Sequence, residues 1–396
     1  MLKVEEKIVS YIMEKKVYVV FGLFILMSLA IRVFVRDCTN GDIENYLLPW
    51  YEQIKANGGL FGGLSKPVYA ANGEICNYTF AYQFLISVMT SLPINPIYAY
   101  KILSVIFDYL LIGAIFNLVS LVNEKADKKN LVIPFCIVLI HPIIFMNSAM
   151  WGQCDSIYTF WIAVSIICLV KEKYVKAFIF YGLAFAFKLQ AIFFLPFLLF
   201  YYVYKKRYSF LYFLIIPAVV VCTGIPAFVQ GRSVVEAFRI YTGNTSLYTR
   251  LAMGYPSFWT IISDGVKTEG YYSLKLVAIA ITVCIIAAHM YYWIDKKADL
   301  SSKNMVYMAF ILAYTTVLFL PGMHERYGYV YEILALIILL FNFKTIRCYI
   351  GLFLVSLAMY GSAIYGTAYN MVILSIANLL IYIYYLKVIN EEIVRG

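Results

Sequence analysis

Apolar runs of roughly 15–25 residues recur along the whole chain with only short polar stretches between them, which is the pattern of repeated bilayer-spanning α-helices. This pattern predicts an all-α polytopic membrane protein. We expect spans at 17–35, 98–122, 131–146, 156–170, 209–228, 272–293, 304–320, 329–343, 348–365 and 370–386.

One apolar stretch, 177–204, does not fit a single span. Basic clusters flank both of its ends, and Lys188 and Gln190 interrupt it. Because one span cannot have both ends in the cytoplasm, we expect a hairpin of two short, partly buried helices, with Lys188 near the outer turn. The total is then about twelve spans (10–13), which places both termini in the cytoplasm.

Two large loops are expected on the outer face, at 36–97 and 229–271. The first contains a predicted helix at 43–56, rich in Trp and Tyr, which favour the headgroup layer. It also contains an apolar stretch, 80–92, that is too short to span comfortably and indicates an interfacial or re-entrant helix. The whole chain, 1–396, is predicted to be a single integral membrane domain, with the first loop as its catalytic part.

Composition and charge agree with this class. Hydrophobic residues make up 63% of the chain and charged residues 14%, with a mean hydropathy of +0.79, whereas a soluble domain carries about 25% charged residues. A formal charge of +10 could indicate a nucleic-acid partner, but the Lys and Arg residues gather in the tails and short loops. This positive-inside pattern instead indicates orientation in the plasma membrane, and no nucleic-acid partner is expected.

Polar chemistry is concentrated in three stretches: Gly41-Asp42-Ile43-Glu44, Met150-Trp151-Gly152-Gln153-Cys154-Asp155 and Met323-His324-Glu325-Arg326-Tyr327. Each lies at the end of an apolar run, and the predicted topology places all three on the outer side. Ionisable groups at membrane depth are costly to keep. Their gathering therefore indicates a polar site rather than scaffold.

The aspartates of these stretches each allow two interpretations. Asp42 could be the N-cap of the helix at 43–56, or a general base that deprotonates an acceptor hydroxyl as it attacks the anomeric carbon of a sugar. Asp155 could simply be solvated. The neighbouring Trp151 and Gln153 favour a corner that binds a sugar or acceptor, because aromatic faces and amides suit polyols.

The basic residues suggest an anionic ligand. Lys188 lies in apolar surroundings, so it snorkels to the headgroups, pairs with another side chain, or meets an anion such as the phosphate of a lipid-linked substrate. No obvious carboxylate lies near it in the sequence. Arg326 is a forked donor suited to phosphate, and His324 could join it. Within the span 131–146, Pro142 is expected to break the helix and His141 to be a hydrogen-bonded core residue.

The sequence requires no cofactor. A divalent cation, Mg²⁺ or Mn²⁺, could be held by Asp42, Glu44 and Asp155, but their spacing does not demand one. Cys38 and Cys76 could form a disulfide or remain separate thiols. The chain has no Walker A loop or dinucleotide fingerprint, so an activated donor would have to come from the membrane.

The combination resembles the GT-C class of polytopic glycosyltransferases. More narrowly, it is similar to bacterial mannosyltransferase-like proteins related to the second mannosyltransferase of GPI-anchor assembly. The matching residues are Asp42-x-Glu44-x-Tyr46, Pro49-Trp50, Gly58-Gly59, Lys101, Asp108, Asn147-Ser148-x-x-Trp151-Gly152-Gln153-Cys154-Asp155, Phe187-Lys188-Leu189-Gln190 and Leu320-Pro321-x-Met323-His324-Glu325-Arg326-Tyr327. The stretch Asn77-Tyr78-Thr79-Phe80-Ala81-Tyr82 lacks a proline that relatives often have there.

The resemblance implies a polyprenyl-phosphate sugar as donor and an acidic residue of the first outer loop, here Asp42, as base. Lys188 and Arg326, with His324, would hold the donor phosphate. The remaining residues of the three stretches would orient the acceptor or a metal ion; these are Glu44, Trp151, Gln153 and Asp155.

We therefore predict a transferase that moves one hexose, with mannose or glucose favoured, to an extracytoplasmic glycan or lipid-linked acceptor. The alternatives are a flippase for lipid-linked oligosaccharides or a small-molecule transporter, and a catalytically inactive scaffold subunit. A transporter should carry ionisable residues through the mid-membrane, and the candidates here are few: Arg32, Asp108, His141, His289 and Glu332.

Overall fold

A computed structural model describes residues 5, 14–123, 128–244, 249–263 and 270–395. These residues form helices, and the β-pairing among them is limited to two isolated bridges. Among these described residues, seven helical segments are long and apolar enough to cross a membrane. They are α2 (Lys16–Phe34), α6 (Pro96–Val122), Leu131–Met150, Phe210–Val229, α15 (Tyr271–Asp295), Phe343–Tyr365 and Met371–Val394 within α19 (Met371–Arg395). The prediction of an all-helical polytopic membrane protein is confirmed at this level.

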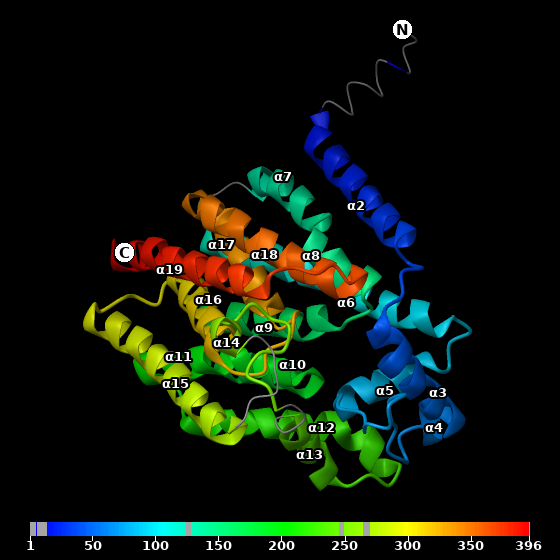
Figure 1. The fold of residues 1–396 in the computed structure, drawn as a ribbon. Coiled ribbons are helices and arrows are strands. Elements are labelled where there is room, and N and C mark those ends of the chain that lie inside the picture. Colours follow the sequence, from blue (N-terminus) through cyan, green and yellow to red (C-terminus); the bar gives the residue numbers. More distant parts are fainter. Residues whose placement is uncertain (1–4, 6–13, 124–127, 245–248, 264–269, 396) are drawn as a thin grey trace.

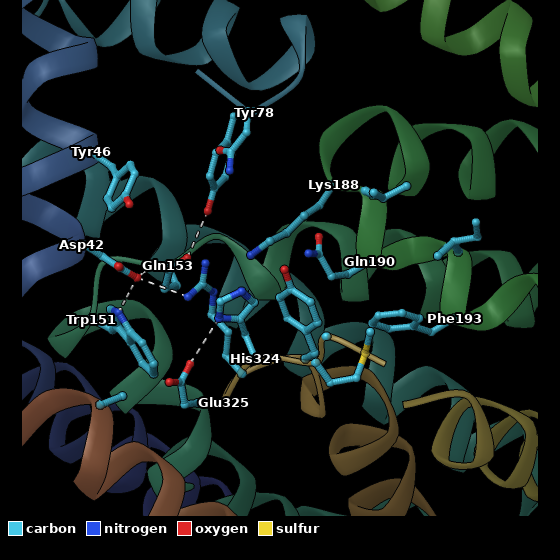
Figure 2. A pocket seen from close by; sticks show the side chains of 18 of the residues that line it. Asp42, Tyr46, Tyr78, Trp151, Gln153, Lys188, Gln190, Phe193, His324 and Glu325 are labelled. Carbon is cyan, nitrogen blue, oxygen red and sulfur yellow. Dashed lines mark hydrogen bonds and ion pairs between the residues drawn. The ribbon is translucent and has the colours of Figure 1, made fainter. Parts of the chain in front are cut away.

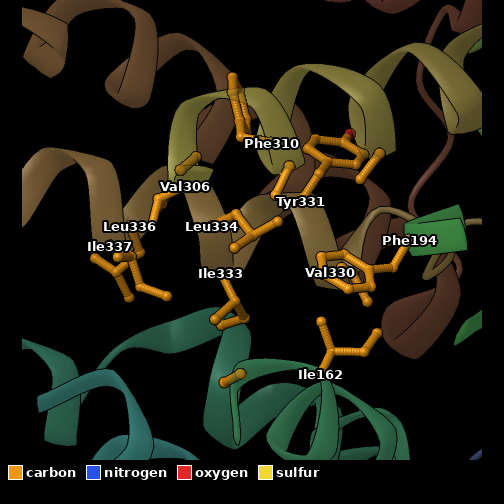
Figure 3. Packing of buried hydrophobic residues seen from close by; sticks show 14 of the residues in the cluster. Ile162, Phe194, Val306, Phe310, Val330, Tyr331, Ile333, Leu334, Leu336 and Ile337 are labelled. Atoms are coloured by element: carbon orange, nitrogen blue, oxygen red, sulfur yellow. The ribbon is translucent and has the colours of Figure 1, made fainter. Parts of the chain in front are cut away.

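Short helices form the centre of the bundle. They are α9 (Asp155–Val170), α10 (Tyr174–Phe187), η3 (Leu189–Phe194), α11 (Leu195–Lys205), α16 (Ser302–Phe319) and α17 (Tyr329–Phe341). α16 is buried from Asn304 through Phe319, as expected for a helix that is apolar on every side and lies in the core. Figure 3 shows α17 between α16 and α9, with Ile333 directed toward Ile162.

The outer helices have apolar surfaces that no protein covers. In α2 and in α15, only 11% of the most apolar stretch of each helix is buried. These two helices lie on opposite sides of the bundle (Figure 1). Leu26 and Leu276, for example, are 64% and 69% exposed. Such surface is stable where lipid takes the place of water. A total of about twelve spans and the orientation of the chain remain predictions.

The span predicted at 131–146 is interrupted where the proline is. α7 (Lys128–Leu139) ends before His141, and α8 (Pro142–Phe145) and the π-helical turn η2 (Met146–Met150) follow. Proline lacks the amide hydrogen that would continue the helix. His141 is buried, and its Nε2 lies 2.5 Å from the hydroxyl of Tyr349. Both predictions for His141-Pro142 are confirmed.

The stretch 177–204 forms the expected hairpin. α10 ends at Phe187, Lys188 is extended (φ −153°, ψ 134°), and η3 and α11 then run back. The return is shown by the rings of Tyr174 and Tyr201, at the far ends of the two arms, whose centroids are 6.4 Å apart. The hairpin places the Lys188 backbone at a break between helices.

The first loop is more compact than predicted. The helix at 43–56 is present as η1 (Ile43–Leu47) and α3 (Leu48–Ala56), followed by α4 (Gly59–Gly62). α5 (Phe80–Met89) falls in the stretch expected to lie on the membrane, but seven of its ten residues are buried. It packs against α3, α10 and α12 (Ile215–Val229), the helix that follows η4 (Phe210–Leu214), so it belongs to the protein core. Cys38 and Cys76 are both free thiols.

The second loop contains α13 (Val234–Asn244) and α14 (Phe258–Ser263). It is joined to the first loop by Gln230, whose Oε1 accepts from the amide of Leu64 at 2.8 Å and whose Nε2 donates to the carbonyl of Leu60 at 3.1 Å. Residues 245–248 and 264–269 of this loop, and most of the tail at 1–16, lie outside the described residues. η5 (Phe343–Thr345) and α18 (Ile346–Tyr365) precede α19.

Candidate active site

A cavity of about 750 Å³ lies where the first loop meets the ends of the short central helices. Its walls come from the start of η1, the η2–α9 junction, the break at Lys188, the segment 320–327 and the first turns of α15. All three polar stretches singled out from the sequence therefore contribute to one pocket (Figure 2). Its volume is typical of sites that enclose a small ligand.

Asp42 accepts from three side chains that come from two other parts of the chain. Its Oδ2 accepts from Trp151 Nε1 at 2.9 Å, from Gln153 Nε2 at 2.7 Å and from Arg326 Nη1 at 3.2 Å. Its carboxylate makes no capping bond to η1. Asn40 caps the helix instead, because its Oδ1 accepts from the amides of Asp42 and Ile43 at 3.0 and 3.2 Å. The capping interpretation of Asp42 is therefore wrong, and the side chain is turned into the pocket.

The two neutral donors to Asp42 are positioned by the turn that follows η2. The amide of Trp151 donates to Met146 at 2.9 Å, and the amide of Gln153 donates to Asn147 at 2.9 Å. The hydroxyl of Tyr78 donates to Gln153 Oε1 at 3.1 Å, so the amide of this side chain has a defined orientation. Burial raises the pKa of Tyr78 well above its ordinary value, which keeps the hydroxyl a donor.

Asp155 begins α9 and pairs directly with Lys188. Asp155 Oδ1 contacts Lys188 Nζ, and Oδ2 accepts from Asn147 Nδ2 at 2.8 Å. The two side chains are only 1% and 6% exposed. Lys188 Nζ also lies 5.6 Å from the ring centroid of Tyr78. Lys188 therefore does not snorkel to the headgroups but pairs, and its partner Asp155 was not identified from the sequence.

Arg326 lies between the two aspartates. In addition to its bond to Asp42, its Nε is 3.9 Å from Asp155 Oδ2, and its guanidinium carbon is 5.5 Å from the ring centroid of Trp151. The Nε atom is buried and has no hydrogen-bond partner among the described residues. A guanidinium has five donor hydrogens in a fixed fork, so Arg326 retains donors for a ligand.

The profile of glycosyltransferase family 87 matches residues 78–321, well over half of the chain. This chain belongs to glycosyltransferase family 87. A comparison with curated proteins gives no match. The matched range of the glycosyltransferase contains Trp151, Gln153, Asp155 and Lys188, whereas Asp42 precedes it and Arg326 follows it.

Of the other predicted site residues in this glycosyltransferase, His324 lies in the pocket and Glu44 does not. His324 lines the pocket, with Nδ1 3.7 Å from Glu325 Oε2 and its ring 5.2 Å from that of Tyr327. Glu44 is exposed and is not among the residues that line the pocket. Among the residues that the structure describes, no three His, Cys, Asp or Glu side chains cluster as a metal site. The predicted trio of Asp42, Glu44 and Asp155 is not brought together.

Sequence reasoning missed three contributors to the pocket. Tyr78 was noted only for departing from a family pattern, although its contact with Gln153 makes it part of the site. Tyr271 and Lys275 line the pocket from α15, and Lys275 Nζ lies 5.9 Å from the ring centroid of Tyr271. A lysine inside an apolar span was the available signal for Lys275, the same signal that identified Lys188.

Gly152 separates the two donors to Asp42 and has a φ of +73°. A left-handed conformation costs a residue with a Cβ about 1–2 kcal/mol, so we expect Gly152→Ala to lower the free energy of unfolding by that amount. We also expect transfer activity to fall further, because Trp151 and Gln153 shift. Gly366→Ala is the control, since Gly366 has φ +67°, open space around its Cβ position and no place in the pocket. Equal losses of activity in both variants would contradict this interpretation.

Proposed function

We propose that this glycosyltransferase moves one hexose, with mannose or glucose favoured, from a polyprenyl-phosphate donor to an extracytoplasmic glycan or lipid-linked glycan. The observation that carries the proposal is the kind of side chain that lines the pocket from one end to the other. Figure 2 shows Asp42 and Phe193 on opposite sides, with Lys188 and His324 between them. Gln190 lies between Lys188 and Phe193 in this view, and the pocket lining also includes the apolar side chains of Leu189, Ile192, Ile279 and Leu320.

This arrangement suits a substrate with a lipid tail, a phosphate and a sugar. The apolar side chains accommodate the first part of the lipid, the cations in the middle face the phosphate, and the sugar lies toward Asp42. Aromatic and amide side chains surround Asp42 on the first-loop side, including Tyr46, Trp50 and Asn45. Such side chains bind polyols, so this end suits the acceptor glycan.

Asp42 would act as the general base. Its three donors converge on Oδ2, and no described residue donates to Oδ1, which is therefore the oxygen available to an acceptor hydroxyl. The acceptor oxygen attacks the anomeric carbon as its proton passes to Asp42. The bond between this carbon and the phosphate oxygen breaks in the same displacement, so the configuration inverts.

Lys188 and Arg326, with His324, would stabilise the charge that develops on the leaving polyprenyl phosphate. Both strong cations already pair with carboxylates, which keeps them in place before the donor arrives. Among the described residues, Arg326 donates to Asp42 through Nη1 alone, so other hydrogens of its guanidinium fork would meet a phosphate oxygen. Trp151 and Gln153 would orient the acceptor. Asp155 does not line the pocket and would act by holding Lys188 in place, and the exposed Glu44 has no place in this proposal.

The orientation belongs to the same proposal. Both termini would be cytoplasmic, and the pocket would open on the outer side of the plasma membrane, because Lys and Arg concentrate in the tails and in the loops opposite the pocket. Membership of a glycosyltransferase family favours this enzyme over a flippase, a transporter or an inactive scaffold. The relation to mannosyltransferases rests on the sequence motifs.

The test is an assay of the purified, detergent-solubilised protein with radiolabelled polyprenyl-phosphate mannose and glucose, and with the matching nucleotide sugars. We expect transfer or release of sugar from one lipid donor and none from the nucleotide sugars. Repeating the assay with EDTA shows whether a divalent cation is required. Turnover of a nucleotide sugar alone, or of no donor, would contradict the proposed donor class.

A further inference from the structure

A buried ion pair lies next to the η2 turn, inside the span region. Arg32 of α2 donates from Nη2 and Nε to Asp108 Oδ2 of α6, at 3.0 and 3.3 Å. The side chains are 4% and 0% exposed. Asp108 is near the middle of α6, where a charge is costly even when paired. A buried ion pair adds little net stability. The residues that this pair contacts point to another role.

The pair holds both sides of the broken helix that leads to the pocket. Before the break, the carbonyl of Leu139 accepts from Arg32 Nη1 at 3.2 Å and from Ser28 Oγ at 2.7 Å. After the break, Ser148 Oγ donates to Asp108 Oδ2 at 2.5 Å. One ion pair therefore fixes the last residue of α7 and the central residue of η2 relative to α2 and α6.

The η2 turn, in turn, carries much of the active site. Asn147 Nδ2 donates to Asp155 Oδ2 at 2.8 Å and to the hydroxyl of Tyr360 at 3.0 Å. The carbonyls of Met146 and Asn147 accept from the amides of Trp151 and Gln153. A single π-helical turn is rare and often occurs at functional sites. The placement of the donors to Asp42 thus depends on the placement of η2.

We propose that the Arg32–Asp108 pair is a positioning device for catalysis. Through Ser148 it fixes the η2 turn, and thereby sets Trp151 and Gln153 against Asp42. Neither Arg32 nor Asp108 lines the pocket, so both act through other residues rather than on substrate. This inference rests on the proposed function. The competing interpretation is that each charge only neutralises the other within the bundle.

Ser148→Ala separates these interpretations, because it removes the link to η2 and leaves the ion pair intact. We expect kcat to fall about tenfold to a hundredfold, since a small displacement of catalytic groups has an effect of this size. The KM for the lipid donor should change less than kcat, because Lys188 and Arg326 pair with Asp155 and Asp42 and neither contacts Ser148. Ser148→Thr, which keeps the hydroxyl, should restore most of kcat.

Ser165→Ala is the matched control. Ser165 is fully buried, and its hydroxyl donates to the carbonyl of Ala177 at 2.9 Å, away from η2. Both alanine variants lose one buried serine hydroxyl, so their thermal stabilities in detergent should be similar. A fall in kcat that is the same in Ser148→Ala and Ser165→Ala would overturn the proposal.

A readout independent of turnover comes from fluorine NMR of protein labelled with 5-fluorotryptophan, with the Trp151 resonance assigned through Trp151→Phe. We expect Ser148→Ala to shift or broaden the Trp151 resonance and Ser165→Ala to leave it unchanged. An unmoved resonance in Ser148→Ala would overturn the proposal whatever happens to kcat. A moved resonance in a protein that turns over no donor would support the positioning role while the proposed function fails.

Discussion

The Asp42→Asn variant is expected to transfer sugar about 10²–10⁴-fold more slowly than the wild-type protein at saturating donor, which is the usual contribution of a general base. An asparagine has nearly the same volume, and its oxygen can still accept from Trp151, Gln153 and Arg326. It cannot take up the proton of the acceptor hydroxyl. The measurement is the initial rate of labelled glycan formation, compared at equal amounts of folded protein.

Asp37→Asn is the control for this change. Asp37 is also in the first loop, and its Oδ1 accepts from the hydroxyl of Tyr98 at 2.5 Å, but it does not line the pocket. We expect this variant to keep wild-type activity. Both variants should be inserted and thermally stable to a similar degree. Full activity of Asp42→Asn would show that another group accepts the proton.

The Lys188→Met variant is expected to lose both stability and activity. Removing one partner of a buried ion pair leaves the other charge uncompensated and costs about 3–5 kcal/mol, and here the residual charge is that of Asp155, which is 1% exposed. Activity should fall as well, because a cation that faces the donor phosphate is lost. Thermal unfolding in detergent and the rate of transfer measure the two effects.

A second comparison separates these two effects. Asp155→Asn and the double variant Lys188→Met/Asp155→Asn both lack the carboxylate, and they differ only in the lysine. We expect the double variant to regain most of the stability lost in Lys188→Met, since no buried charge is left unpaired. We also expect it to bind polyprenyl phosphate at least tenfold more weakly than Asp155→Asn. Equal affinity in the two would mean that Lys188 serves only to neutralise Asp155.

The class of the protein and several helix boundaries could be predicted from the sequence because they depend on local rules. The proline after His141 ends α7, and the polar Lys188 and Gln190 mark the break in the hairpin. The helix predicted at 43–56, rich in Trp and Tyr, is also present. These features follow from which residues can continue a helix and which can remain among apolar neighbours.

The number of membrane spans is not settled by the same reasoning. Hydropathy reports that a segment is removed from water, but it does not tell whether lipid or protein covers it. α16 is covered by protein on all sides, whereas α15 has a mostly uncovered apolar surface. α5 shows the same limitation: it is short and apolar, which suggested the membrane surface, yet it is buried by neighbouring helices.

The candidate site was partly predictable. Because polar residues at the outer ends of spans can meet only at the membrane surface, Asp42, Trp151, Gln153 and Arg326 were correctly expected to lie near one another. Their pairing was not predictable. Lys188 and Asp155 are separated by α9, a turn and α10, and Asn40, two residues before Asp42, takes the capping bond. Such choices depend on side-chain geometry in three dimensions.

The most direct measurement follows both halves of the donor in one reaction. Polyprenyl-phosphate hexose labelled with one isotope in the lipid and another in the sugar is incubated with wild-type protein and with Asp42→Asn, in the presence of a glycan acceptor. If the sugar is transferred in the pocket with Asp42 as base, the wild-type protein should produce equal amounts of free polyprenyl phosphate and glycosylated acceptor. Asp42→Asn should produce almost none of either. An intact donor after incubation with well-folded wild-type protein, or equal turnover by both proteins, would contradict this mechanism.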